Sequence, residues 1–201
     1  MPLVFPAIPE IPRGSFVLVT GTTGSGKTSF VRQVTEPEDD CLILSGENSF
    51  NWVRPDRRQY HRQVGTPSDV ANTVGEFIRA GRSLRMVVID DLNLVCQSRA
   101  IQVAALIAQG SEMAWRLVSD LRGRVDLFET TMIVTWQIPR EISDNLRGAT
   151  PVGPAHLRFN ADLILNLQGG EVVVTKNRSG FAPNRLQPAR PWWERLDLDL
   201  C

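Results

Sequence analysis

One stretch of eight residues, 21–28, constrains the fold of this chain more than any other part of it. It spells a complete G-x-x-x-x-G-K-[ST] phosphate-binding loop. Its members are Gly21, Thr22, Thr23, Gly24, Ser25, Gly26, Lys27 and Thr28. The apolar run 16–20 before the loop predicts a buried strand, and residues 28–34 after it predict a short helix. That is the setting in which this motif binds nucleotides.

The chemistry of the loop predicts a site for nucleotide phosphates. Its glycines allow main-chain conformations in which successive N–H groups face phosphate oxygens. The N-terminus of the following helix adds partial positive charge. We expect Lys27 to reach the β and γ phosphates and the Thr28 hydroxyl to ligate Mg²⁺.

Lysine is rare in this chain. Of 22 basic residues only Lys27 and Lys176 are lysines, and all the others are arginines. Because arginine serves well on an ordinary surface, we expect both lysines to lie where a compact ammonium group is needed. The phosphate loop explains Lys27, whereas Lys176 needs a separate explanation.

Length and composition limit the possible classes of protein. A chain of 201 residues suits one α/β domain and is short for two. The formal net charge of zero predicts no overall attraction to nucleic acid, so any contact with a polyanion must come from a local arginine cluster. No apolar stretch is long enough for a membrane span, and the first residues do not resemble a signal peptide. Three cysteines, far apart, favour a reducing compartment such as the cytoplasm.

Predicted strands and helices alternate along the chain. Apolar runs predict strands over 16–20, 41–45, 85–91 and 130–136, and a hairpin formed by 161–167 and 171–176. Apolar periodicity predicts helices over 28–34, 69–80 and 98–124. The fold class is therefore α/β: a mostly parallel central sheet with helices on both faces and a C-terminal β-hairpin. We expect one core over 1–180, with an extended lead-in over 1–15, and a tail over 181–201.

Four further segments give local expectations. Ser68 is the expected N-cap of the helix over 69–80, whose buried face is expected to hold Val70, Val74, Phe77 and Ile78. The arginine-rich connection around Tyr60 is expected to be a solvated loop. The long segment 138–160 is read as a functional loop with a helical turn or two. Trp192 and Trp193 in the tail are expected to dock, on this protein or on a neighbour.

Four polar side chains follow four predicted strands directly: Lys27, Glu47, Asp90 and Gln137. The carboxyl ends of parallel strands meet at one edge of a sheet, where such folds place their active sites. Phosphoryl transfer to water requires a held metal, a bound γ-phosphate and an oriented water. We expect Asp90 to hold Mg²⁺, Glu47 to orient and deprotonate the water, and Gln137 to contact the γ-phosphate.

Several segments together resemble the RecA/RadA/DnaB/KaiC superfamily of P-loop ATPases, over about residues 11–180. Residues 11–15 resemble its lead-in, 44–48 the segment of its catalytic glutamate, 87–92 its Walker B strand, and 154–162 the segment that closes its DNA-binding loop. The most specific likeness is 174–180, Val-Thr-Lys-Asn-Arg-Ser-Gly, which resembles the Lys-Asn-Arg motif of RadA. In this sequence we find no additional N-terminal domain, no zinc motif and no convincing polymerisation motif of the Phe-x-x-Ala kind, so we expect a bare RecA core such as compact phage or viral proteins contain.

The resemblance implies an ATPase that uses ATP and Mg²⁺ and works as a homo-oligomer, a ring or filament with a hexamer as the expected ring. It implies that Lys176 and Arg178 reach the nucleotide of the next subunit. It also implies a DNA partner, with single-stranded DNA favoured, and the activities of a recombination or annealing ATPase, a helicase or a packaging motor. We expect the contact at Arg140, Arg147 and Arg158.

Two alternatives remain open at this stage. Asp91 occupies the position at which FtsK/HerA motors carry their catalytic glutamate, so it competes with Glu47 for the role of base. A KaiC-like regulatory or assembly ATPase would use the same nucleotide site with a protein partner in place of DNA. We expect the protein to be cytoplasmic, and to lie in the host cytoplasm if it is viral.

Overall fold

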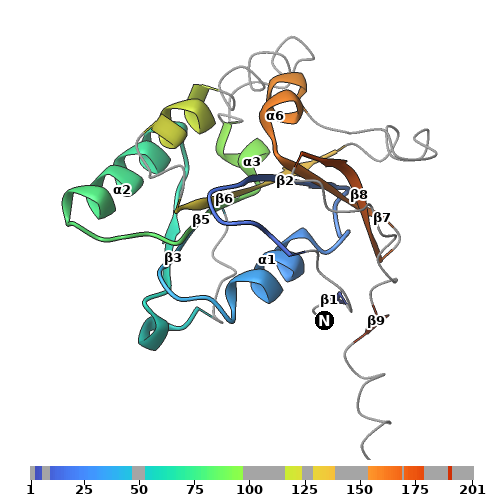
Figure 1. Cartoon of the computed structure of the whole chain (residues 1–201), viewed down its shortest axis with the longest axis horizontal. Helices are drawn as coiled ribbons and strands as arrows, with labels where there is room; N and C mark the ends of the chain where they lie inside the picture. The colour runs from blue at the N-terminus through green and yellow to red at the C-terminus, as the bar shows by residue number, and fades with distance from the viewer. Residues whose placement is uncertain are drawn as a thin grey trace, which may run out of the picture.

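The structure is a computed structural model that describes residues 3–5, 10–46, 53–96, 116–123, 129–138, 154–168, 170–178 and 190–191. A seven-stranded sheet with the order β4-β3-β5-β6-β2-β7-β8 runs through it (Figure 1). The strands are β2 (Phe16–Gly21), β3 (Cys41–Ser45), β4 (Tyr60–Gln63), β5 (Met86–Asp90), β6 (Thr131–Gln137), β7 (Leu163–Gln168) and β8 (Glu171–Asn177). All pairs are parallel except β7 with β8, so the mostly parallel sheet and its C-terminal hairpin are confirmed.

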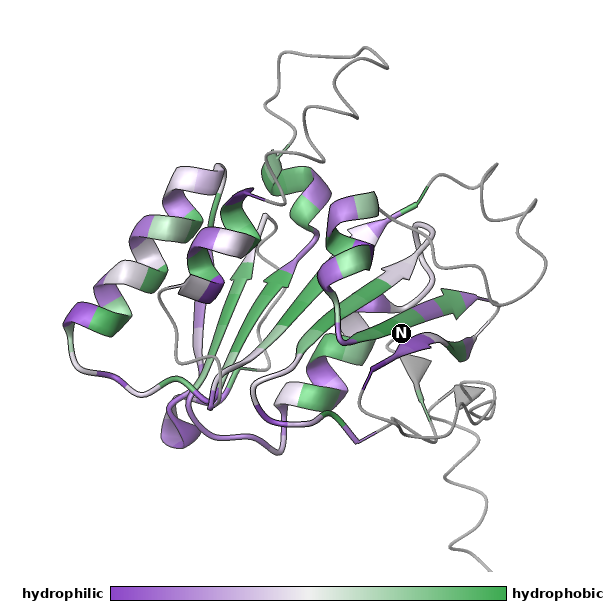
Figure 2. Ribbon diagram, turned by 45° about the horizontal axis from the view of Figure 1, so that its top comes forward, coloured by the Kyte–Doolittle hydropathy of each residue, from purple (hydrophilic) through white to green (hydrophobic). Residues whose placement is uncertain are grey.

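Helices cover both faces of the sheet (Figures 1 and 2). One face packs on α1 (Lys27–Thr35) through the fully buried Phe30 and Val31. The other face packs on α2 (Pro67–Arg79), α3 (Leu92–Cys96), a helix that includes residues 116–123, and α6 (Ala155–Asn160). Alternate residues of each central strand enter the two cores, which is why the strand sequences are nearly continuous apolar runs.

The connection after β3, for which the sequence predicts a loop, contains a strand. β4 pairs in parallel with β3, and Tyr60 packs edge-on against Phe77 of α2 with 5.0 Å between ring centroids. The strand is at the edge of the sheet, and its side chains are half-buried or exposed. An edge strand with polar side chains lacks the apolar pattern by which buried strands are found, so the loop expectation for residues 60–63 was wrong.

The start of α2 differs by two residues from the sequence expectation. The N-cap is Thr66, not Ser68, and Asp69 completes a capping box with it. The Thr66 hydroxyl accepts the Asp69 N–H at 3.2 Å, while the Asp69 carboxylate accepts the Thr66 N–H at 2.9 Å. Val70, Val74 and Phe77 are buried as expected, but Ile78 is 37% exposed.

The helical region expected over 98–124 is described in part. Residues 116–123 are helical, and Leu117, Val118 and Leu121 are buried as the periodicity predicts. Residues 97–115 lie outside the described part of the chain. The short helix α3, which starts directly after the carboxylates of β5, was not foreseen.

The lead-in and the tail meet in a small antiparallel pair, β1 (Leu3–Val4) with β9 (Arg190–Pro191). Phe5, next to β1, is fully buried and packs edge-on against Phe30 of α1. The Gln33 side chain accepts the Phe5 N–H at 2.8 Å and donates to the Phe5 carbonyl at 2.5 Å. Trp192 and Trp193 lie outside the described residues. In the part of the chain that the structure describes, no helix is long and apolar enough to cross a membrane.

Candidate nucleotide-binding site

The carboxyl ends of β2, β6 and β5 lie next to one another at one edge of the sheet. β6 is inserted between β2 and β5, and Gln137 pairs in register with Gly21, the first residue of the phosphate loop. Ser45, at the end of β3, pairs with Asp90. The topology therefore brings the phosphate loop, Gln137 and Asp90 together at this edge.

Two glycines of the loop are required by its shape. Gly26 has φ 94°, in the left-handed region, and is the N-cap of α1. At Gly21, a Cβ atom would lie 2.2 Å from Ser25 Oγ and 3.0 Å from the Leu167 carbonyl oxygen. A side chain at position 21 would therefore require Ser25 and the main chain at Leu167 to shift. Ser25 Oγ is itself buried without a hydrogen-bond partner in the structure, and it belongs to the loop that would enclose the phosphates.

Lys27 lies inside the loop and is only 8% exposed. Its Nζ donates to the Gly21 carbonyl at 3.2 Å and to the Thr22 carbonyl at 3.0 Å. Burial lowers the pKa of the Lys27 ammonium group, while the carboxylates of Asp91 and Asp90 act in the opposite direction. The ammonium group is held within the loop by two carbonyls and attracted by two nearby acids.

Thr28 and Asp90 are in direct contact across the site. The Thr28 hydroxyl donates to Asp90 Oδ2 at 2.8 Å, although 62 residues separate them in the sequence. Both are oxygen ligands of the kind that Mg²⁺ prefers. In the described ranges no group of three or more His, Cys, Asp or Glu side chains could hold a metal ion. Mg²⁺ in nucleotide sites is commonly bound by one or two protein side chains together with phosphate oxygens and water.

Thr135, which the sequence analysis did not single out, holds the second oxygen of Asp90. Its hydroxyl donates to Asp90 Oδ1 at 2.7 Å and accepts the Asp91 N–H at 2.6 Å. Thr135 is fully buried. A hydroxyl residue inside the apolar run 131–136 was a signal that could have identified it.

Gln137 is linked to the phosphate loop and to α3. Its Nε2 donates to Thr23 Oγ1 at 2.7 Å. Its main chain exchanges two hydrogen bonds with the Asn93 side chain, at 2.7 Å to Asn93 Oδ1 and 2.8 Å from Asn93 Nδ2. Asn93 was also missed, because nothing in its spacing marks it. The end of β6 is therefore fixed on both sides, toward the loop and toward the residues after Asp90.

Asp91 begins α3. Its main-chain oxygen accepts the Leu94 and Val95 N–H groups, and its Oδ1 lies 3.4 Å from the Leu94 nitrogen. Its φ is 58°, a conformation that aspartate adopts more readily than most residues. Asp91 therefore caps α3, and its carboxylate is also close enough to Lys27 to raise the pKa of that ammonium group.

Three of the predicted site residues, Glu47, Arg140 and Arg147, lie outside the described residues. Glu47 follows Gly46, which stands at the same edge of the sheet as Asp90 and is packed against Leu94: a Cβ on Gly46 would lie 2.6 Å from Leu94 Cδ2. Arg158 lies on α6 and is half-buried.

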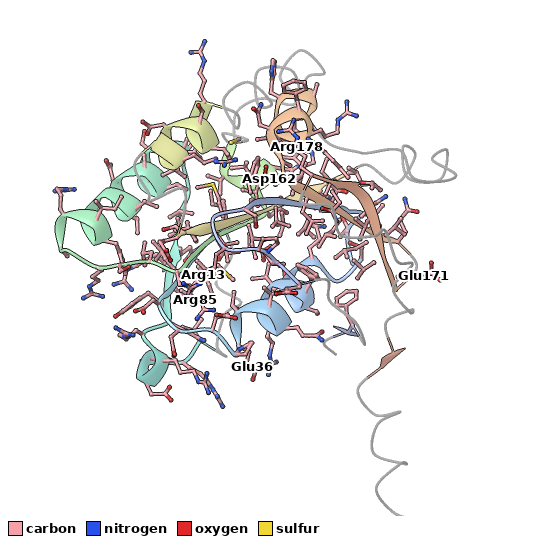
Figure 3. All side chains as sticks on the ribbon, viewed as in Figure 1. Arg13, Glu36, Arg85, Asp162, Glu171 and Arg178 are labelled. Atoms are coloured by element: carbon pink, nitrogen blue, oxygen red, sulfur yellow. The ribbon has the colours of Figure 1, made fainter. Side chains whose placement is uncertain are left out.

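Lys176 and Arg178 lie far from the phosphate loop of their own chain. Asn177 pairs with Leu163, which pairs with Val17 at the start of β2, whereas the loop follows the end of β2. Lys176 Nζ donates to the carbonyls of Arg158 and Phe159 at 2.6 and 2.7 Å, and Arg178 Nη2 donates to the Phe159 carbonyl at 2.6 Å. Both cations thus bind the C-terminal end of α6, where their positive charges interact favourably with the negative end of the helix dipole. Figure 3 shows Arg178 beside Asp162, whose carbonyl accepts the Arg178 N–H.

Two cavities lie at the opposite end of the sheet from the phosphate loop, with volumes of about 260 and 320 Å³. Arg13 and Arg85, which are labelled in Figure 3, line the first of them. The charges there pair with one another: Arg13 with Glu129 at 3.1 Å, Arg85 with Glu38 at 3.0 Å and Arg58 with Asp40 at 2.8 Å. These cavities are therefore less suited to the predicted chemistry than the edge that holds Lys27 and Asp90.

Comparison with known proteins gives one limited similarity. No protein-family model matches the chain. Over 80 residues the chain is 35% identical to "ABC transporter I family member 17" of Arabidopsis thaliana. That stretch is 38% of this chain and 30% of the relative. The similarity points to the broad superfamily of P-loop ATPases and no further, and the α/β fold with its mostly parallel sheet is consistent with it.

Proposed function

We propose that this protein is a Mg²⁺-dependent ATPase whose nucleotide is bound by the loop 21–28. The observation that supports this most is the 2.8 Å contact between Thr28 and Asp90, since it joins the end of the phosphate loop to the strand expected to hold the metal. The partial similarity to "ABC transporter I family member 17" also supports a nucleotide-binding ATPase.

The residues present fit Mg²⁺ and a nucleoside triphosphate. The unpaired Ser25 Oγ, the glycine-shaped turn at Gly26 and the N-terminus of α1 provide donors for phosphate oxygens. Lys27 supplies a positive charge, and Thr28 with Asp90 supplies oxygen ligands. When bound, Mg²⁺ neutralises negative charge that develops on the phosphates.

Each residue has a distinct task in this proposal. Lys27 exchanges its two carbonyl partners for phosphate oxygens. The side-chain amide of Gln137, which donates a hydrogen bond to Thr23, would lie between the loop and the attacking water. Glu47 or Asp91 takes the proton from that water, and Glu47 is favoured because its side chain is one methylene longer. The sheet edge brings at least Lys27, Gln137 and Asp91 to one place.

The finer proposal is that the chain is RecA-like and assembles so that Lys176 and Arg178 serve the nucleotide of a neighbouring subunit. Their location supports this role, because the length of the sheet separates them from their own phosphate loop. We further propose that DNA is the partner and that the segment 138–160 contacts it, with Arg158 of α6 next to Lys176 of β8 and to Arg178, which follows β8.

Nucleotide affinity tests the central part of the proposal. A fluorescent ATP analogue is titrated into the wild type, Lys27→Ala and Arg79→Ala, with Mg²⁺ and with a chelator. We expect Mg²⁺-dependent binding in the wild type and a loss of at least about tenfold in Lys27→Ala, because a charge-assisted contact is worth about 1.5–3 kcal/mol. Arg79 is exposed on α2 and donates to Gly75, so Arg79→Ala removes a positive charge without touching the loop. Equal binding by all three proteins would refute the assignment.

A further inference from the structure

Thr135 lies in the interior of the sheet, yet it carries a hydroxyl group. It is on β6, between the strand that leads to the phosphate loop and the strand that ends in Asp90, and it is 0% exposed. Its neighbours Val134 and Trp136 are buried apolar residues. Valine has nearly the same shape and would avoid the cost of burying a hydroxyl, so the hydroxyl at this position requires an explanation.

The hydrogen bonds of Thr135 have a defined direction. A hydroxyl group has one proton, and the Asp91 N–H occupies an acceptor position of Oγ1 at 2.6 Å. The Thr135 proton is therefore directed at Asp90 Oδ1, 2.7 Å away. Asp90 Oδ2 accepts the proton of Thr28 at 2.8 Å. Each oxygen of the Asp90 carboxylate thus accepts a threonine hydroxyl, one from β6 and one from α1.

This arrangement determines which way Thr28 faces. Because the Thr28 proton points at Asp90, the lone pairs of Thr28 Oγ1 remain for a cation at the phosphate loop. The carboxylate can impose that direction only if it does not rotate, and Thr135 fixes its other oxygen. The same hydroxyl binds the N–H of Asp91, whose φ of 58° sets the turn into α3.

We propose that Thr135 is a positioning residue of the magnesium site: it holds Asp90 so that Thr28 presents its hydroxyl oxygen to Mg²⁺. This inference rests on the proposed function and adds to it a residue that would not itself touch metal or nucleotide. It predicts that loss of the hydroxyl affects the contribution of Mg²⁺ to nucleotide binding, and not the contribution of the loop.

The test compares Thr135→Val, Thr135→Ser and the wild type by the affinity for a fluorescent ATP analogue with Mg²⁺ and with a chelator. We expect Thr135→Val to lose about tenfold in affinity with Mg²⁺ and less than about twofold without it. Thr135→Ser keeps the hydroxyl and is expected to restore most of the Mg²⁺ effect. A purely structural role would weaken binding equally under both conditions.

Thr130→Val is the matched control. Thr130 precedes β6, is 6% exposed, and donates its hydroxyl to the Leu84 carbonyl at 2.7 Å, at the end of the sheet away from the site. This variant should bind as the wild type does with and without Mg²⁺.

If the wild type shows a Mg²⁺ effect that Thr135→Val retains in full, the inference about Thr135 is wrong while the proposed function stands. If the wild type binds no nucleotide, the proposed function fails, and with it the inference. If Thr135→Val does not fold, Thr135→Ser decides: a folded serine variant with no Mg²⁺ effect overturns the role of the hydroxyl.

Discussion

Lys27, which we propose binds phosphate, is buried although charged side chains ordinarily lie in solvent. Its ammonium group is buried, and burial lowers its pKa even though Asp91 and Asp90 are near. Its ammonium group donates to two main-chain carbonyls of the loop, those of Gly21 and Thr22. A buried ammonium group of this kind is more common at functional sites than in ordinary protein interiors.

The lowered pKa gives a prediction for stability against pH. Between the lowered pKa of Lys27 in the folded protein and the ordinary value of 10.5, the unfolded chain binds more protons than the folded one. Unfolding free energy should therefore rise with pH in this interval. The unfolding free energies of the wild type and Lys27→Met are measured with urea from neutral pH toward 10.5. We expect the value of the wild type to rise relative to that of Lys27→Met as the pH increases. A difference independent of pH would show that burial does not disfavour the charged form.

The identity of the base is the other question at the residue scale. Glu47→Gln should keep ATP binding and lose at least about a hundredfold in turnover, the lower end for loss of a general base. Asp91→Asn should have a milder effect, because the side chain of Asp91 also caps α3. Turnover that survives Glu47→Gln but not Asp91→Asn would assign the base to Asp91 and favour an FtsK/HerA-like motor.

At the scale of elements, α2 illustrates how local chemistry sets a boundary that periodicity leaves open. Thr66 and Asp69 exchange hydrogen bonds at its start, and Pro67 occupies its first turn. Thr66→Ala should lower the unfolding free energy by about 1 kcal/mol, as is typical for loss of an N-cap. Ser68→Ala, at the exposed residue that the sequence suggested, should change it by less than about 0.5 kcal/mol. A larger loss for Ser68→Ala in chemical denaturation would contradict the observed cap.

Most of the sheet was predictable because its strands are buried on both faces, so residues such as those of β5 form unbroken apolar runs that end in a carboxylate. The polar edge strand β4 and the short helix α3 lack such a signal, since each is positioned by its neighbours. The same division holds in the site. The loop and Asp90 follow from a motif and a strand end, but the contacts of Thr135 and Asn93 depend on the order of strands, which the sequence does not specify.

Among the described residues, the cations proposed to serve the nucleotide lie in two places: Lys27 in the phosphate loop, and Lys176 and Arg178 at the end of the hairpin away from that loop. If Arg178 serves a neighbouring subunit, mixing Lys27→Ala with Arg178→Ala should restore part of the ATPase activity, because some interfaces then contain two intact halves. Arg178→Ala that is fully active at every protein concentration would exclude this role. Arg178 would then serve only to hold the end of α6.

The proposed partner is tested separately from the nucleotide site. Single-stranded DNA should bind with marked dependence on salt, and replacing Arg140, Arg147 and Arg158 by alanine should weaken binding without changing basal ATP hydrolysis. Binding is measured by fluorescence anisotropy over a range of salt concentrations. Unchanged affinity in the triple variant would place the DNA contact elsewhere, and ATP hydrolysis that no DNA stimulates would favour a protein partner of the KaiC-like kind.

ATP hydrolysis by the purified protein tests the account most directly. The rate of phosphate release is measured with Mg²⁺, with a chelator, and for Lys27→Ala under the same conditions, after circular dichroism has shown that the variant is folded. The account predicts hydrolysis that requires Mg²⁺ and is abolished in the folded Lys27→Ala protein. Hydrolysis by Lys27→Ala at the wild-type rate, or a wild type that neither binds nor hydrolyses ATP, would contradict it.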